Sequence, residues 1–224
     1  MTTKTLPHID IYPMVYSPFD KFARIRKELE NSIDLPPVQS GFEIHSPIGH
    51  AQHAVRRHDN LLPNLITERL NALESMKAVR SVMPRLQDIP EIRKYRVSYG
   101  SHSAAGVDAE LMHYGQPLHP GQVLFHGGVF PRNDTTPMNS FVIPNAFSTS
   151  LCAQVAATHS TYHAPKDVWI LRIAPGSTTR AVVLGFKGQT LGHEMEVLLG
   201  AGAQITLQGV HQDGDYTLFE ADVF

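Results

Sequence analysis

The sequence predicts an α+β fold in which an N-terminal helical part precedes a mixed or antiparallel sheet. Apolar residues in the first hundred positions recur at helical spacing. From residue 121 onward the chain changes to short apolar runs separated by glycine, proline and Asp-Gly turns, which are typical of strands. No regular alternation of strands and helices is present, which argues against a parallel Rossmann-type sheet.

Length and charge indicate one large domain or a domain with a helical annex. The chain has 224 residues, of which 42% are hydrophobic and 18% charged, as expected of a folded globular protein. Residues 1–100 hold 14 Lys and Arg against 11 Asp and Glu, whereas residues 101–224 hold 5 against 10. We therefore predict two structurally different halves, an extended leader and helical lobe over 1–100 and a strand-rich core over 101–224, although a chance distribution of charge remains an alternative.

Several functional classes are disfavoured by composition. The chain has no basic run interleaved with aromatic residues of the kind that binds nucleic acid, and no apolar run long enough to span a membrane. Residues 1–8 lack the apolar segment of a cleaved secretory signal. The single cysteine, Cys152, excludes an internal disulfide and is typical of a reducing compartment. We expect a soluble protein, either cytoplasmic or delivered into a host cell.

Helices are predicted where apolar residues recur every three or four positions near capping residues. The longest predicted helix, 63–83, carries Leu62, Ile66 and Leu70 at this spacing and ends before Pro84. Further helices are expected over residues 19–31, after a Ser17-Pro18 start, over 104–113, and near 151–159; residues 1–16 are expected to be an extended leader and 38–60 a loop.

Four histidines in the predicted loop raise the question of a metal site. They are His45, His50, His53 and His58. Their spacing is not a recognised zinc signature, and no cysteine or paired carboxylate completes the set. The chain has 13 histidines, so local clustering needs no special cause. A metal-binding domain of unrelated function is kept as an alternative, but no metal is expected.

The strand-rich half ends in a pair of carboxylates. The predicted strands span residues 122–126, 147–151, 167–173, 181–184, 196–199, 203–209 and 216–223. In an extended chain, residues two apart point to the same face, so Glu194 and Glu196 are expected side by side with Met195 on the opposite face. Spacing alone is equally compatible with a solvated strand edge.

Four motifs in order resemble the ADP-ribosyltransferase superfamily, in its arginine–serine–glutamate branch. They are Leu124-Phe125-His126-Gly127, Phe147-Ser148-Thr149-Ser150, Ile173-Ala174-Pro175-Gly176 and Glu194-Met195-Glu196. The resemblance covers about residues 121–224. It implies an ADP-ribosyltransferase-like core of two mixed or antiparallel sheets, NAD as substrate, and a target protein with an accessible arginine as acceptor.

The resemblance also implies roles for individual residues. Glu196 would stabilise the positive charge that develops on the ribose, Ser148 would orient Glu196, and Glu194 would face the acceptor. Residues 185–192 would form the acceptor-recognition loop. The other residues that the resemblance places at NAD are His126, Gly127, Phe147, Thr149, Ser150 and, as the best candidate for a phosphate contact, Arg132.

One residue departs from the family pattern. The first-strand arginine is replaced by His126, which is the residue that the other branch of the superfamily carries there. Because the ordinary pKa of imidazole is near 6.5, a histidine does not carry a permanent positive charge at neutral pH and is a poor counterion for a diphosphate. Arg96 and Arg172 are further candidates beside Arg132 to supply that charge. The alternative function is a catalytically impaired member that acts as a binding protein.

Overall fold

The computed structural model describes residues 5–17, 41–57, 61–98, 100–184 and 194–224. The helix predicted over 19–31 and the predicted acceptor loop, 185–192, lie outside the described residues. In the part of the chain that is described, no helix is both long and apolar enough to cross a membrane.

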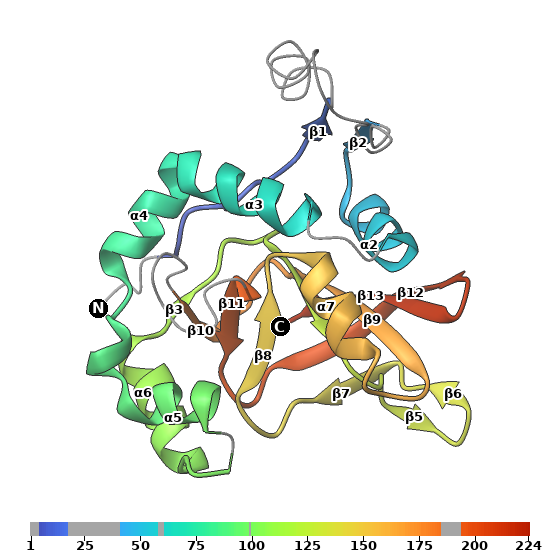
Figure 1. Cartoon of the computed structure of the whole chain (residues 1–224). Helices are drawn as coiled ribbons and strands as arrows, with labels where there is room; N and C mark the ends of the chain where they lie inside the picture. The colour runs from blue at the N-terminus through green and yellow to red at the C-terminus, as the bar shows by residue number, and fades with distance from the viewer. Residues whose placement is uncertain (1–4, 18–40, 58–60, 99, 185–193) are drawn as a thin grey trace, which may run out of the picture.

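A nine-stranded mixed sheet forms the centre of the molecule (Figure 1). Its strand order is β3-β10-β11-β8-β4-β9-β13-β12-β7. The bounds are β3 Gln116–Pro117, β4 Val123–Gly127, β7 Ser140–Val142, β8 Phe147–Ser150, β9 Lys166–Ile173, β10 Arg180–Val183, β11 Glu196–Leu199, β12 Gln204–Asp213 and β13 Tyr216–Val223. All neighbours are antiparallel except β9 and β13, which are parallel.

The strands that were predicted to form two sheets are hydrogen-bonded into one continuous sheet. A single register pair, Phe125 with Ser150, connects β4 to β8, whereas β4 pairs with β9 over five residues. The α+β class and the mixed character of the sheet are therefore confirmed. The narrow connection lets β4 and β8 diverge, and the candidate site lies at this divergence. Two short hairpins lie outside the sheet, β1 Met14–Tyr16 with β2 Phe42–Ile44 and β5 Arg132–Asn133 with β6 Thr136–Pro137.

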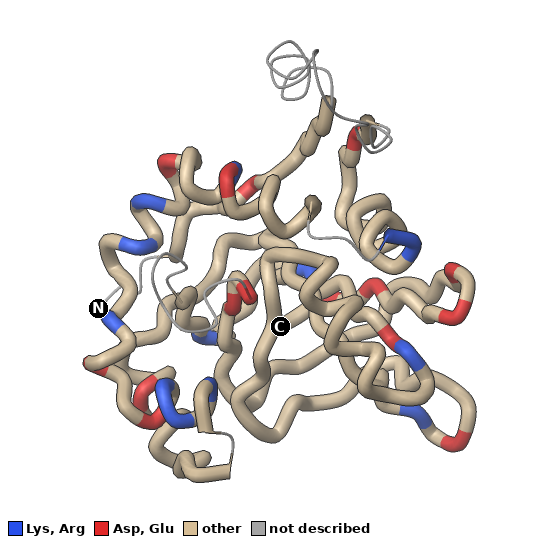
Figure 2. The backbone as a smooth tube through the Cα atoms, viewed as in Figure 1, with Lys and Arg blue, Asp and Glu red and all other residues tan. Residues whose placement is uncertain are grey.

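The described helices are α2 Pro47–Arg56, α3 Leu61–Ala72, α4 Glu74–Val82, the 3₁₀ turn η1 Leu86–Asp88, α5 Pro90–Val97, α6 Ala104–Tyr114 and α7 Ala153–Ser160. Helices α5 and α6 lie at the β3–β10 end of the sheet, whereas α2 and α7 lie over its central strands (Figure 1). Helix α7 packs on β4 and β9, and α2 packs on α7. Lys and Arg follow α4 and α5, in keeping with the basic first half of the chain (Figure 2).

The single helix predicted over 63–83 is two helices. Leu73 has an extended conformation (φ −71°, ψ 127°) that separates α3 from α4. A straight continuation of the apolar stripe of α3 would turn Lys77 toward the core, whereas the break buries Met76 and Val79 instead. Because no glycine or proline marks the break, tertiary packing and not local propensity determines it.

The prediction of a loop over 38–60 is wrong for its described part, which contains β2 and α2. The Ser46 side chain accepts a hydrogen bond from the Gly49 amide, and Pro47 occupies the first helical turn. This is the same Ser-Pro signal that predicted a helix after Ser17. Helix α2 buries Ala51 and Ala54 completely.

Residues from both halves of the chain share the hydrophobic core. The larger cluster packs Leu6 and Ile9 of the leader with strands of the sheet. The smaller cluster joins Ile92 of α5 to Leu198 of β11. The boundary at residue 100 remains a prediction, but this packing fixes α5 beside β11 and so sets one wall of the site.

Candidate functional site

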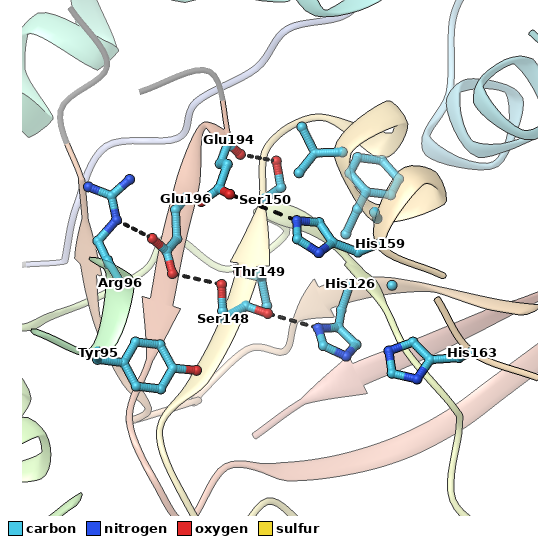
Figure 3. Close-up of a pocket in the computed structure, with 14 residues that line it drawn as sticks. Tyr95, Arg96, His126, Ser148, Thr149, Ser150, His159, His163, Glu194 and Glu196 are labelled. Atoms are coloured by element: carbon cyan, nitrogen blue, oxygen red, sulfur yellow. Dashed lines mark hydrogen bonds and ion pairs between the residues drawn. The ribbon is translucent and has the colours of Figure 1, made fainter. Parts of the chain in front are cut away.

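A cavity of about 450 Å³ lies where β4, β8 and the start of β11 face α5 and α7 (Figure 3). The side chains around it combine two carboxylates, three imidazoles, hydroxyl groups and one guanidinium. Its lining residues are Tyr95, Arg96, Phe125, His126, Gly127, Ser148, Thr149, Ser150, Val155, Ala156, His159, His163, Glu194 and Glu196.

Glu196 is the most constrained carboxylate of the cavity. Its Oε1 accepts a hydrogen bond of 2.7 Å from Ser148 Oγ, and its Oε2 accepts one of 2.6 Å from Arg96 Nε. The Arg96 and Glu196 side chains are 1% and 4% exposed. Burial raises the pKa of Glu196, while Ser148 and Arg96 oppose that rise by favouring the ionised form. The predicted contact between Ser148 and Glu196 is therefore present.

Sheet register explains why these two side chains meet. Glu196 pairs with Ser150 across β8 and β11, and Leu198 pairs with Ser148. Ser148 is thus the diagonal neighbour of Glu196 on the same face. The hydroxyl of Thr149 instead donates to the Val197 carbonyl at 2.6 Å.

Glu194 reaches the same cavity by a different backbone path from the one predicted. Met195 has a left-handed conformation (φ 49°), so the segment before β11 is not an extended strand. Ser150 Oγ donates to the Glu194 carbonyl at 2.6 Å and accepts from the Cys152 amide at 3.0 Å. Ser150 therefore holds the backbone that presents Glu194, while Met195 is buried.

His126 lies at the base of the cavity as a neutral imidazole. Its Nδ1 is 2.8 Å from the Ser148 carbonyl, which only accepts, so Nδ1 carries the proton. The ring packs on Phe147 and Trp169 at centroid distances of 4.2 and 4.9 Å. Burial lowers the pKa of His126 to about 4. At neutral pH His126 is therefore a hydrogen-bonding group and not a counterion.

Gly127 permits a close approach between elements. A Cβ atom at this position would overlap the carbonyl oxygen of Ala156 and crowd the Ser160 amide. Glycine is therefore required for helix α7 to pack on β4, whatever the cavity binds. This packing brings the lining residues of α7 to the cavity.

Arg132, which was predicted to contact a phosphate, does not line this cavity. Its guanidinium donates to both oxygens of Asp167, at 2.7 and 3.0 Å, and to the Phe130 carbonyl at 2.8 Å. Because Asp167 is fully buried, the pair serves the packing of β9. Arg172, the weaker candidate, is exposed on β9 and is likewise absent from the cavity lining.

Three lining residues with polar side chains were not predicted. Tyr95 precedes Arg96 on α5, His159 lies in the last turn of α7, and His163 lies in the turn after it. His159 Nε2 lies 3.9 Å from Glu194 Oε1. The sequence contains a spacing of four between the two histidines, but helix α7 ends at Ser160, so that the turn after the helix and not a shared helix face brings His163 to the cavity.

The histidine-rich segment 45–58 has structural roles where it is described. His50 Nδ1 lies 3.1 Å from the Tyr12 hydroxyl, and its Nε2 accepts from the Ala153 amide at the start of α7. Burial lowers the pKa of His50 to about 3. Within the described ranges no group of three or more His, Cys, Asp or Glu residues is arranged to hold a metal; His58 lies outside those ranges.

The fold is similar to that of solved ADP-ribosyltransferases. Vis, an ADP-ribosyltransferase from Vibrio splendidus solved with an inhibitor, aligns with a TM-score of 0.50 at 14% identity, over 76% of this chain and 89% of that chain. Weaker similarities include the enzymatic component C2-I of the Clostridium botulinum C2 toxin (TM-score 0.42, 12% identity, 65% and 45% covered) and Plx2a, an ADP-ribosyltransferase toxin from Paenibacillus larvae (0.36, 12%, 77% and 96%).

No protein-family profile and no curated protein sequence matches the chain. At the identities above, structural similarity shows the fold and leaves activity to be argued from the cavity. The ADP-ribosyltransferase-like fold predicted from four short motifs is thus confirmed.

Proposed function

We propose that the protein is an NAD-dependent mono-ADP-ribosyltransferase that modifies an arginine of a target protein. The observation that carries this proposal is the hydrogen bond between Ser148 and buried Glu196 in a cavity that Glu194 also lines. On this fold, the arrangement supports one carboxylate for the ribose and a second for the acceptor.

Glu196 has the chemistry needed for departure of nicotinamide. The bond between the ribose carbon and the nicotinamide nitrogen breaks, its electron pair leaves with nicotinamide, and positive charge develops on the ribose. A buried carboxylate already held by Ser148 stabilises that charge without reorganisation. Arg96 neutralises part of the Glu196 charge. It also favours ionisation of the Glu196 carboxyl group, whereas burial opposes that ionisation.

Glu194 is suited to the acceptor. Its side chain is 23% exposed, against 4% for Glu196, so it lies nearer the solvent from which a protein acceptor arrives. A carboxylate pairs well with a guanidinium group. A guanidinium nitrogen forms the new bond to the ribose carbon, and the proton that it loses passes to the Glu194 carboxylate.

A toxin or effector role is part of the proposal. The similar structures from Clostridium botulinum and Paenibacillus larvae are described as toxin components. By this analogy the partner is a protein of another cell with an accessible arginine, reached by delivery of this chain into that cell.

A second candidate function is NAD-independent binding by an inactive member of the fold. It is favoured by His126, which is neutral where the resembling family carries an arginine. Calorimetry with NAD separates the two candidates. Absence of NAD binding at millimolar concentration, together with absence of nicotinamide release, supports the binding protein and contradicts the transferase.

Paired substitutions test the two carboxylate roles. We expect Glu196→Gln to lower nicotinamide release from NAD at least about a hundredfold, since it removes the charge at the developing cation. Glu194→Gln should lower transfer to agmatine, a small guanidinium acceptor, more than it lowers NAD hydrolysis.

Glu74→Gln is the matched control, because Glu74 is 84% exposed on α4 and contacts only Lys77 among the ion pairs of the described residues. It should retain both activities. Unchanged hydrolysis in Glu196→Gln would remove the assignment of the cavity, and equal loss of both activities in Glu194→Gln would contradict the acceptor role.

A further inference from the structure

The fixed charges of the cavity do not suit the diphosphate of NAD at neutral pH. Glu194 and Glu196 contribute two negative charges and Arg96 one positive charge among the described lining residues. NAD brings two negative charges on its diphosphate and one positive charge on its nicotinamide ring. An anionic ligand would therefore enter a cavity that is itself negative, which costs affinity.

Of the three arginines considered for the diphosphate, two are committed to carboxylates and the third, Arg172, does not line the cavity. Arg96 Nε donates to Glu196 at 2.6 Å, with both side chains buried. Arg132 donates to both oxygens of Asp167. His126 is neutral because burial lowers its pKa to about 4. In the described lining, additional positive charge can come from the remaining imidazoles.

Two imidazoles are placed to supply it. Val155, Ala156, His159 and His163 lie at positions that form one face of α7 and the turn after it, and all four line the cavity. In Figure 3 His163 lies beside His126, on the side of the cavity away from Arg96. Positive charge on His159 and His163 lowers the pKa of His126, so both are within electrostatic reach of the cavity base.

We propose that His159 and His163, in their protonated forms, bind the diphosphate of NAD, so that NAD affinity is higher at acidic than at alkaline pH. This inference rests on the proposed function. Protonation of both residues changes the net charge of the described lining from negative to positive. His159 also lies in the last turn of α7, where a cation interacts favourably with the helix dipole.

Several titratable and charged groups face the two histidines across the cavity. His159 faces Glu194, whose carboxylate is 3.9 Å away, and both histidines face His126 of β4. Across the cavity stand Tyr95 and the paired Arg96 and Glu196.

On the outer sides of α7, strand β9 and helix α2 present groups that are already engaged. These are the Arg132–Asp167 pair, Lys166 with Asp215 at 3.8 Å, Arg56 with Asp213 at 2.9 Å, and His50, which accepts from the Ala153 amide. None of them lines the cavity. The proposed response of the cavity to pH is therefore assigned to His159 and His163.

Calorimetric titration of the full chain with NAD at pH 8.0 and pH 6.0 tests the inference. One added unit charge near a phosphate strengthens binding about fivefold at a separation of about 4 Å in a water-like medium, so we expect binding at least about fivefold tighter at pH 6.0. His159→Gln and His163→Gln should each reduce that difference, and the double variant should abolish it. His113→Gln, at an exposed site on α6, is the matched control and should keep it.

Fixed charge provides the converse test. His163→Lys should bind NAD at pH 8.0 about fivefold more tightly than the unsubstituted protein does at pH 8.0, because lysine supplies one of the two charges without acidification. Pyrophosphate should compete with NAD at pH 6.0, whereas nicotinamide should compete equally at both pH values. Circular dichroism of each variant at both pH values establishes that it is folded.

The outcomes separate this inference from the proposed function. Equal NAD affinity at both pH values, or a full pH response in the folded double variant, overturns the role of the two histidines and leaves the transferase intact if nicotinamide is still released. No NAD binding and no nicotinamide release at either pH value overturns both.

Discussion

The two walls of the cavity differ in how their polar groups are held. The glutamate wall, formed by Ser148, Glu196 and Arg96, is buried and closed by hydrogen bonds of 2.6 and 2.7 Å. The histidine wall, formed by His126, His159 and His163, combines a neutral buried imidazole with one imidazole in the last turn of α7 and one in the turn after it. Under the two proposals above, the glutamate wall serves the chemistry and the histidine wall serves the affinity for NAD.

Arg132 belongs to neither wall, because it pairs with Asp167 and does not line the cavity. Its substitution has the largest expected effect on stability. Arg132→Met leaves the Asp167 carboxylate buried without its counterion, which should lower the free energy of unfolding by about 3–5 kcal/mol. Urea denaturation measures this loss, and calorimetry on the folded protein should find NAD affinity unchanged. Wild-type stability combined with weaker NAD binding would return Arg132 to the phosphate site. Arg172→Met, at an exposed position on β9, is the control.

Lowering the pH should destabilise the folded protein because it protonates the buried His126. Because the pKa of His126 is about 4 in the folded protein and about 6.5 when unfolded, its contribution to stability is present above pH 6.5 and is lost as pH falls toward 4. The expected loss is about 3 kcal/mol over that range. His126→Gln should lose less stability than wild type between pH 6.5 and 4 in urea titrations, whereas His113→Gln should not differ. Equal slopes for all three proteins would contradict the neutral, buried state of His126.

Arg96 should act on the glutamate wall through the ionisation of Glu196. Arg96→Met leaves Glu196 buried without its guanidinium partner, so the pKa of Glu196 rises further and the acid limb of the activity profile moves to higher pH. We expect about tenfold less nicotinamide release at pH 7 with partial recovery at pH 8 or above. Arg93→Met, at an exposed position on the same helix, is the control. A uniform loss at every pH value would indicate a purely structural role.

Substitution of Ser148 should have the smallest effect among these predictions, and that effect is on kcat. Ser148→Ala removes one of the two hydrogen bonds that orient Glu196, which is worth about 1.5–3 kcal/mol for a charged acceptor but is partly replaced by water in an open cavity. We expect a fivefold to tenfold lower kcat, as an approximate range, with little change in KM for NAD. Ser140→Ala on edge strand β7 is the control. A change in KM alone would mean that Ser148 contacts NAD and does not position Glu196.

Short ordered motifs were sufficient to predict the fold and the presence of Glu194, Glu196 and Ser148 in one cavity. Glu194 is only two residues before Glu196, and Glu196 meets Ser148 across one strand pair, where register determines which side chains meet. The hydroxyl groups of Thr149 and Ser150 hold backbone carbonyls, a role that strand pattern alone does not distinguish from ligand binding.

Contacts between distant segments could not be predicted in this way. Arg96 is 100 residues from Glu196, and their meeting depends on the packing of α5 against β11. The left-handed conformation of Met195 is unusual for a side chain of its size, so alternation predicted an extended segment there. The break at Leu73 likewise follows from the core and not from a local signal.

The most direct test of the central claim is mass spectrometry of a cell lysate incubated with NAD and the protein. We predict that wild-type protein attaches ADP-ribose to arginine side chains of one or a few target proteins and that Glu196→Gln attaches none. Modification confined to other residue types would contradict the acceptor assignment. Equal modification by wild type and Glu196→Gln, or none by wild type at pH 6 and pH 8, would contradict the claim that this cavity catalyses the transfer.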